Sequence, residues 1–289
     1  MPGQAESKYL VSTDWLAERL GAPGLVIVDA SWHLPTANRS GAAEFLERHI
    51  PGAVYFDIDA IADKSVSLPH MLPDPVAFSG AVRKLGIGDG MKIVVYDSVG
   101  LFSAARVWWM FRAFGARDVS VLDGGLPKWL AEGKPVTEGE ARPQSRHFTA
   151  RLDHALVASL DDVRAASSKA GEPGVAQLVD ARSAPRFRGD ELEPRPGLRS
   201  GHIPGSRNLP WGDLIVEGRL LPPEKLAALF AGAGFDPSKP TITTCGSGVS
   251  ACIVALAMAT AGRPAVPVYD GSWAEWGLRS DLPMAKGPA

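Results

Sequence analysis

The chain has 289 residues, 45% of them hydrophobic and 21% charged, which excludes a disordered or low-complexity protein. Its 30 Lys and Arg residues nearly balance 32 Asp and Glu residues, so the net charge of −2 provides no global attraction to nucleic acid or an anionic membrane. Two cysteines exclude a disulfide scaffold and a zinc site of several thiolates, and they favour a cytoplasmic location. No secretion signal or membrane span is expected, because no apolar run approaches the ~18 residues that a span needs.

Short apolar strands and amphipathic helical segments alternate along the first half of the chain. Strands are expected at residues 25–30 and 92–97, and a helical period marks residues 14–20 and 76–85. This alternation is typical of an α/β fold in which a mainly parallel sheet carries helices on both faces. Ligands of such folds bind at the carboxyl ends of the strands, so the loops after the strands are the places to search for a site.

The second half of the chain repeats landmarks of the first half in the same order. They are a strand ending in Asp-Ala, a His-Ile-Pro-Gly turn, an apolar strand and an Asp-Gly turn, found at Asp29 and Asp180, His49 and His202, Asp97 and Cys245, and Asp123 and Asp270. Collinear matches of this kind indicate a duplicated domain, and they favour a structural role for the repeated histidines. We expect an N-terminal domain over residues 8–140, a polar linker over 141–157 and a C-terminal domain over 158–285.

The strongest chemical signal is the loop after the expected strand at 241–245. It reads Cys245-Gly246-Ser247-Gly248-Val249-Ser250. The glycines let backbone N–H groups turn inward beside the positive end of the following helix, which makes an anion-binding nest and favours a nucleophilic thiolate. A buried, inert cysteine is the alternative for Cys245, and it is the favoured interpretation for Cys252 inside the apolar helix.

These motifs resemble tandem rhodanese domains over nearly the whole chain, and the Cys245 loop resembles the persulfide loop of the family's 3-mercaptopyruvate sulfurtransferases. Further matches are His70-Met71-Leu72-Pro73, the segment 106–112 and Asp270-Gly271-Ser272-Trp273. The resemblance implies two tandem rhodanese-like domains and an enzyme that carries sulfur as a persulfide on Cys245. The loop departs from the family at Ser250, where Thr is more usual. Asp97 replaces the cysteine in the first half, so the N-terminal domain is expected to be catalytically inactive.

The resemblance also implies roles for residues outside the loop. Arg186 and Arg195 would bind the substrate carboxylate and keto oxygen, although solvated surface charge is the alternative for any single arginine. Ser247 would form a relay with His70 and Asp59, whereas from spacing alone His70 could be a loop histidine and Asp59 a helix cap. The remaining residues expected to contact the substrate are Gly246, Gly248, Val249 and Ser250.

The expected reaction moves the sulfur of 3-mercaptopyruvate to a thiol acceptor, such as thioredoxin or a small thiol, or to cyanide, and releases pyruvate. No metal, cofactor, nucleic acid or membrane partner is expected. A thiosulfate sulfurtransferase is the first alternative, but its family loop carries Arg and Lys where this chain has Gly246 and Ser247. A phosphatase of similar fold would need arginine at Ala251. A non-catalytic persulfide carrier or redox sensor that uses Cys245 is the third alternative.

Overall fold

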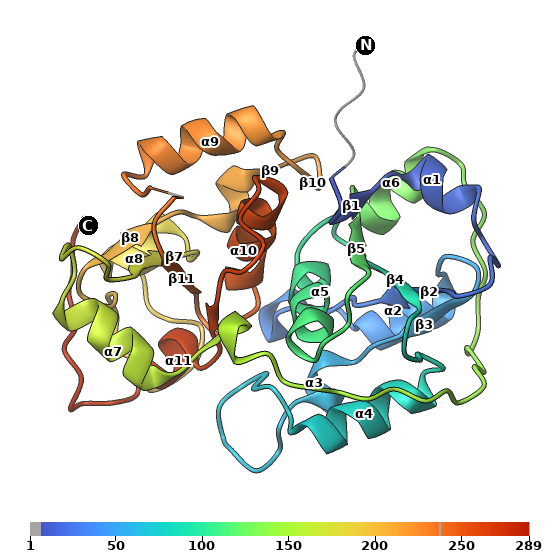
Figure 1. Cartoon of the computed structure of the whole chain (residues 1–289), viewed down its shortest axis with the longest axis horizontal. Coiled ribbons are helices and arrows are strands. Elements are labelled where there is room, and N and C mark those ends of the chain that lie inside the picture. Colours follow the sequence, from blue (N-terminus) through green and yellow to red (C-terminus); the bar gives the residue numbers. More distant parts are fainter. Residues whose placement is uncertain (1–6, 237, 289) are drawn as a thin grey trace. The chain divides into compact units, whose positions relative to one another are not determined.

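The computed structural model describes residues 7–236 and 238–288, which form two compact units. The first unit contains the described residues up to 63, together with 72–153 and 217–220. The second contains residues 64–71, 154–216 and the described residues from 221 onward. Each unit is a sheet with helices on both sides (Figure 1). No helix in the described part of the chain has the length and apolar character needed to cross a membrane.

The first unit has a five-stranded sheet in the order β1-β5-β4-β2-β3, and all of its strand pairs are parallel. The strands are β1 (Leu10–Val11), β2 (Leu25–Asp29), β3 (Ala53–Tyr55), β4 (Lys92–Tyr96) and β5 (Val119–Leu122). The central strands β2 and β4 consist mainly of Val and Ile and are buried along most of their length. This is expected for strands of a parallel sheet that is covered on both faces.

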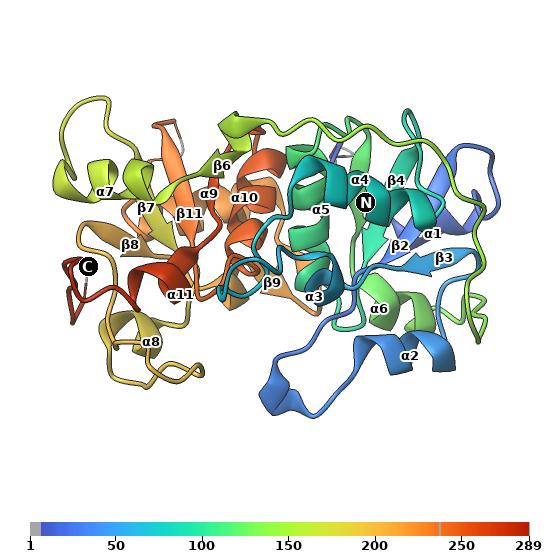
Figure 2. The ribbon, with the colours of Figure 1, turned by 90° about the horizontal axis from the view of Figure 1, so that it is seen from below.

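Helices cover both faces of this first sheet (Figure 2). One face carries α1 (Thr13–Ala17), α2 (Gly41–Glu47) and α6 (Gly125–Ala131), and the other carries α3 (Ile58–Ile61), α4 (Pro75–Lys84) and α5 (Ser103–Ala113), with a short 3-10 helix, η1 (Pro35–Ala37), after β2. Leu16, Phe45 and Trp129 pack against the sheet on the first face. An aromatic cluster that includes Phe78 and Phe111 fills the second.

The second unit repeats this architecture with a parallel sheet in the order β6-β12-β11-β7-β8. Its sheet strands are β6 (Val157–Ala158), β7 (Gln177–Asp180), β8 (Ser206–Asn208), β11 (Thr241–Thr244) and β12 (Val268–Tyr269). Two further short strands, β9 (Ile215–Val216) and β10 (Arg219–Leu220), lie outside the five-stranded sheets. The expected fold class, two α/β domains with mainly parallel sheets, is confirmed. Strand β6 begins at the last residue of the expected linker.

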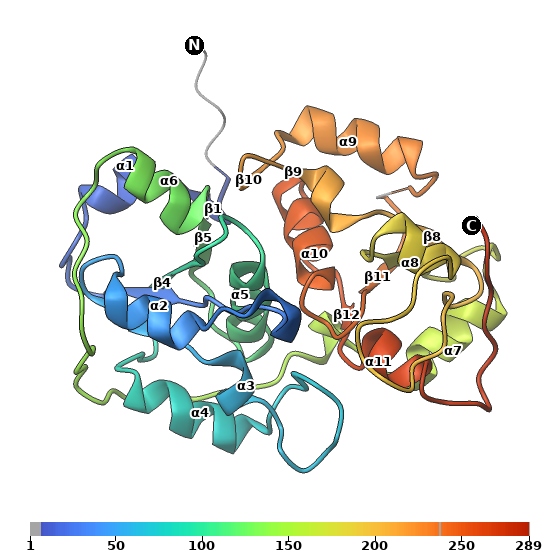
Figure 3. The ribbon, with the colours of Figure 1, turned by 180° about the vertical axis from the view of Figure 1, so that it is seen from behind.

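The helices of the second unit also lie on both sides of its sheet (Figure 3). They are η2 (His154–Leu156), α7 (Leu160–Ser168), α8 (Ala184–Arg188), η3 (Trp211–Leu214), α9 (Pro223–Gly232), α10 (Ala251–Thr260) and α11 (Ser272–Trp276). Val163 of α7 packs with Trp273 and Trp276 of α11 on one face. Helix α10 is almost entirely buried, which explains why its sequence is apolar on every side.

The two His-Ile-Pro-Gly turns have the same structural role in both units. The Nδ1 atom of His49 lies 2.7 Å from the carbonyl oxygen of Phe45, and its ring stacks on the Phe45 ring at 3.8 Å. His202 repeats this arrangement with Phe187, at 2.8 Å and 3.8 Å. Both histidines are buried, so the structural role expected from their repetition is confirmed.

The carboxylates that end β2 and β7 show how the units differ. In the second unit Arg182 lies next to Asp180, with its Nη2 atom 2.6 Å from Oδ2. In the first unit the corresponding position is Ser31, whose backbone N–H donates to Asp29 at 2.8 Å. Burial therefore raises the pKa of Asp29 to about 6, because removal of water disfavours the ionised form.

The raised pKa of Asp29 predicts a pH-dependent stability. Since the folded-state pKa lies above the unfolded value, the folded state binds more protons between about pH 4 and pH 6, and stability falls as pH rises through this window. The free energy of unfolding of Asp29→Asn, measured in urea, should rise relative to that of the wild type by up to about 3 kcal/mol from pH 4 to pH 7. A difference that is the same at every pH would contradict this prediction.

Candidate active site

Cys245 lies directly after β11, the central strand of the second unit's sheet, and its side chain is 1% exposed. Its backbone is held on both sides: the N–H donates to Ser272 Oγ at 3.2 Å, and the carbonyl accepts from the Trp273 N–H at 2.9 Å. The Ser272 hydroxyl donates in turn to the Tyr269 carbonyl at 2.7 Å. These contacts fix the sulfur at the carboxyl edge of the sheet, where ligands of parallel sheets bind.

The six-residue loop from Cys245 to Ser250 leads into α10. Gly248 has a φ of 76°, in the left-handed region that strongly favours glycine. Ser247 and Val249 are buried. In residues 7–236 and 238–288, no hydrogen-bond acceptor takes the backbone N–H groups of Ser247, Val249 and Ser250. These donors are therefore available to a ligand at the amino end of the helix.

The corresponding loop of the first unit holds an anion of its own. Asp97 follows β4 as Cys245 follows β11, and its side chain is fully buried. Its carboxylate accepts hydrogen bonds from the backbone N–H groups of Val99, Phe102 and Ala104, at 3.0, 2.6 and 2.9 Å. A loop of this kind thus stabilises negative charge with backbone donors and the amino end of a helix. In the second unit the same place is occupied by sulfur.

A buried ion-pair network lies beside the Cys245 loop. The Glu193 side chain is 1% exposed and joins two arginines: Oε1 lies 2.7 Å from Arg182 Nη1, and Oε2 lies 2.5 Å from Arg186 Nη2. Arg182 is itself paired with Asp180, and its guanidinium lies 4.5 Å from the centre of the Trp273 ring. These ion pairs fix the positions of both guanidinium groups. Truncating one member of the network would leave a buried charge without its partner, which is strongly destabilising.

Arg186 reaches the Cys245 loop from α8. A Cβ atom placed on Gly246 would lie only 3.0 Å from Arg186 Nη2. A side chain at position 246 would therefore shift the Arg186 guanidinium by a few tenths of an ångström, whereas glycine leaves it undisturbed. The close approach also places a guanidinium, the group best suited to grip a carboxylate, next to the residue that follows the cysteine.

His70 and Arg195 come together although they are 125 residues apart in the sequence. Arg195 Nη2 lies 3.2 Å from His70 Nε2, and since guanidinium has only donors, the imidazole nitrogen accepts. His70 has a φ of 61°, which is uncommon for a residue with a side chain, and it is buried. Strained conformations of this kind cluster at functional sites. His70 and Arg195, like Cys245 and Arg186, belong to the second unit.

Asp59 belongs to the first unit and lies in α3. Its Oδ2 atom accepts a hydrogen bond from Trp32 Nε1 at 2.8 Å. The residue that caps α3 is Asp57, whose carboxylate accepts from the Ala60 N–H at 3.0 Å. The alternative interpretation of Asp59 as a helix cap is therefore wrong, because the cap lies two residues earlier.

Cys252 has the environment of a structural residue. It is fully buried in α10, and its Sγ–H donates to the Gly248 carbonyl at 3.2 Å. Within the described residues, neither cysteine belongs to a group of three or more potential metal ligands. This agrees with the expectation that Cys252 is a small packed hydrophobe.

Two contributors to the site were missed in the sequence. Ser272 stands where the first repeat has Gly125, and both have positive φ angles, of 49° and 53°. A side chain at a position that favours glycine is a signal that could have been found from the repeat alone. Glu193 is one of three acids in an arginine-rich segment, with Asp190 and Glu191, and nothing in its spacing distinguishes it from a surface charge.

A model of the rhodanese-like domain matches residues 12–132 and 160–279. The 3-mercaptopyruvate sulfurtransferase of Escherichia coli K12 is 46% identical over 277 residues, which cover 96% of this chain and 97% of the relative. The thiosulfate sulfurtransferase of Bos taurus is 45% identical over 284 residues, with coverage of 96% and 94%.

Among solved structures, the crystal structure of SseA from Escherichia coli matches with a TM-score of 0.84. It is 44% identical in sequence, and the match covers 92% of this chain and 98% of that one. The same family is indicated by the two domain matches, by the sheet order that both units share and by these relatives. The chain belongs to the rhodanese family of sulfurtransferases, with two rhodanese-like domains in tandem.

Proposed function

We propose that this protein is a 3-mercaptopyruvate sulfurtransferase that carries sulfur as a persulfide on Cys245. One observation supports this most directly: Cys245 occupies the place at which the first unit holds the Asp97 carboxylate with three backbone N–H groups. A persulfide is an anion at the same position. The identities of 46% and 45% do not separate the two named substrates, so the choice between them rests on the charges of the site.

The reaction follows from a thiolate placed beside backbone donors and guanidinium groups. The Cys245 thiolate attacks the sulfur of 3-mercaptopyruvate, and an S–S bond forms as the C–S bond breaks. The electron pair of the C–S bond goes to carbon, giving the enolate of pyruvate, which takes up one proton. A thiol acceptor, such as thioredoxin or a small thiol, then removes the outer sulfur and regenerates the Cys245 thiol in a ping-pong cycle.

We assign the substrate carboxylate and keto oxygen to Arg186 and Arg195, with Gly246, Gly248, Val249 and Ser250 forming the surface around the sulfur. Arg186 is held by Glu193 beside the loop, and Arg195 lies against His70. Ser247 and His70 are proposed to handle the proton that the enolate takes up. The participation of Asp59 stays a prediction from the family resemblance.

We further propose that the inactive N-terminal domain spans residues 8–140, followed by a linker over 141–157 and the catalytic domain over 158–285. A reducing compartment such as the cytoplasm suits the protein, because a free thiol at residue 245 is the group that reacts. The proposed cycle uses the sulfur donor, the acceptor and the protein's own side chains, with no metal or organic cofactor.

The assignment of the nucleophile predicts different outcomes for the two cysteines. Cys245→Ser should abolish pyruvate release from 3-mercaptopyruvate, because a serine hydroxyl is scarcely ionised at neutral pH and cannot store sulfur. Cys252→Ser, the matched control in α10, should keep most of the activity. Activity and thermal unfolding are measured for both variants. Wild-type turnover by a folded Cys245→Ser variant would remove the persulfide mechanism.

The arginine assignment predicts losses in kcat/KM. Arg186→Ala and Arg195→Ala should each lose roughly 10-fold to 100-fold, since a charge-assisted hydrogen bond contributes about 1.5 to 3 kcal/mol. Arg188→Ala is the control, because Arg188 lies on the same short helix as Arg186 and pairs with the exposed Asp190. Glu193→Gln should give a smaller loss than Arg186→Ala. If Arg186→Ala and Arg195→Ala match the control, the two arginines do not bind the substrate.

Loop charge predicts substrate choice. Thiosulfate is a compact dianion, whereas 3-mercaptopyruvate is a monoanion whose carboxylate can be met outside the loop by arginines. Gly246→Arg with Ser247→Lys should raise kcat/KM for thiosulfate and lower it for 3-mercaptopyruvate. Ser247→Lys alone is informative because it adds charge while leaving the Arg186 contact with Gly246 undisturbed. Parallel loss of both activities in folded variants would show that loop charge does not select the substrate.

A further inference from the structure

A cavity lies in the second unit, at the opposite end of the sheet strands from Cys245. Its volume is about 540 Å³, within the range of small-molecule sites. Thr241 and Ile242, at the start of β11, form part of its wall, whereas Cys245 follows the other end of that strand. Neither Arg186 nor Arg195 lines it. The cavity is therefore separate from the proposed sulfur-transfer site.

The walls of this cavity are mostly apolar. They come from β6, from α7, from the segments before β7 and β12, and from the end of α10, and include Val157, Ala166, Val175, Met258 and Val266. Some of these side chains are also part of the unit's core, so the wall has a fixed shape. An apolar group that enters such a cavity leaves water and is stabilised in proportion to the area it buries.

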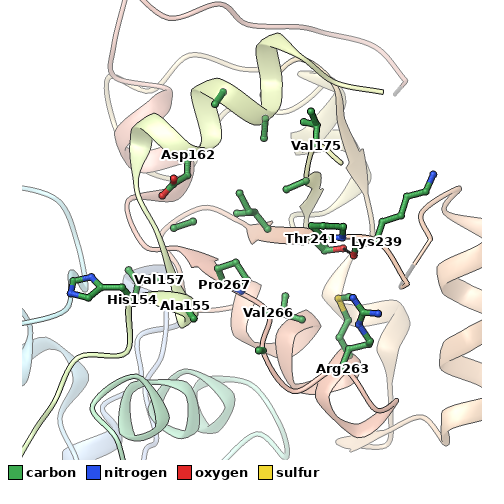
Figure 4. A pocket seen from close by; sticks show the side chains of 18 of the residues that line it. His154, Ala155, Val157, Asp162, Val175, Lys239, Thr241, Arg263, Val266 and Pro267 are labelled. Carbon is green, nitrogen blue, oxygen red and sulfur yellow. Dashed lines mark hydrogen bonds between the residues drawn. The ribbon is translucent and has the colours of Figure 1, made fainter. Parts of the chain in front are cut away.

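Positive charge gathers at one end of the cavity. Figure 4 shows Lys239 and Arg263 at one end and Asp162 at the other. Lys169 also lines the cavity, and within the described residues none of these three cations forms a salt bridge. The Asp162 carboxylate is already engaged, since it accepts from the Ser159 N–H at 2.8 Å and from the Ser159 hydroxyl at 2.6 Å.

One further carboxylate, Asp236, is close enough to feel these cations. Its pKa is lowered first by hydrogen bonds from Ser238 and further by the charges of Lys239 and Arg263. The Asp236 carboxylate accepts from the Ser238 N–H at 2.9 Å and from its hydroxyl at 2.6 Å. Both carboxylates keep their charge, but the three cations exceed the two acids, so this region has an excess of positive charge that can meet a ligand.

We propose that this cavity binds a small amphipathic organic anion. Its apolar body would lie against the wall of α7 and β11, and its acid group would meet Lys239 and Arg263. The charge pattern favours an anion over an amphipathic cation, because the three cations that line the cavity outnumber its one carboxylate, Asp162. The proposal concerns a binding function and does not depend on the reaction at Cys245.

The test uses anilinonaphthalene sulfonate, a fluorescent probe that joins an aromatic body to a sulfonate. It should bind the folded full-length protein saturably and be displaced by octanoate, but not by octanol or inorganic sulfate at equal concentration. Lys239→Gln with Arg263→Gln should weaken binding about five-fold, as expected for partly exposed charges. Ala165→Trp, on the exposed side of α7, should block the cavity.

Two control variants locate the probe. Lys225→Gln removes an exposed lysine on α9, outside the cavity, and should bind like the wild type. Arg195→Ala should also bind like the wild type, whereas weakened binding in this variant would place the probe at the sulfur-transfer site and overturn the proposal. Unchanged affinity in the Lys239 and Arg263 double variant, or equal displacement by octanol and octanoate, would overturn it as well. All variants of the cavity should keep the wild-type rate of pyruvate release.

Discussion

The site depends on one constraint: a negative group at the carboxyl end of the central strand must be met by backbone N–H groups. Each unit builds this feature from its own equivalent strand, six-residue loop and helix: β4 and α5 in the first unit, β11 and α10 in the second. The first unit fills it with the Asp97 carboxylate, which accepts three backbone hydrogen bonds. The second unit places the Cys245 sulfur there and leaves loop donors available. The same architecture thus holds a structural anion in one unit and a candidate nucleophile in the other.

The charges around the loop have diverged between the units in the same way. At the end of β7, Asp180 is paired with Arg182, and Glu193 extends this network to Arg186 beside Gly246. At the end of β2, the first unit has no arginine at the equivalent position, and burial raises the pKa of Asp29. In the second unit each buried carboxylate is therefore paired with an arginine, and one of these arginines, Arg186, reaches the loop. Arg186 and Arg195 are proposed to bind the substrate carboxylate there.

The repeat made the fold predictable, because landmarks such as the His49 and His202 turns occupy equivalent places and make equivalent contacts. The Cys245 loop was also predictable, because a cysteine and two nearby glycines directly follow a strand and precede a helix. Glu193 was not, because its importance comes from arginines that only the folded chain brings around it. The cavity lined by α7 and β11 was also beyond sequence reasoning, since segments between residues 154 and 267 contribute to its wall.

The most direct test of the persulfide on Cys245 is the mass of the protein after treatment with 3-mercaptopyruvate in the absence of an acceptor. The account predicts an increase of about 32 Da, the mass of one sulfur atom, which fragmentation places on Cys245 and not on Cys252. Addition of a thiol should remove this mass while pyruvate release continues in the steady state. Sulfur located on Cys252, or steady release of pyruvate by a protein that never gains this mass, would contradict the account.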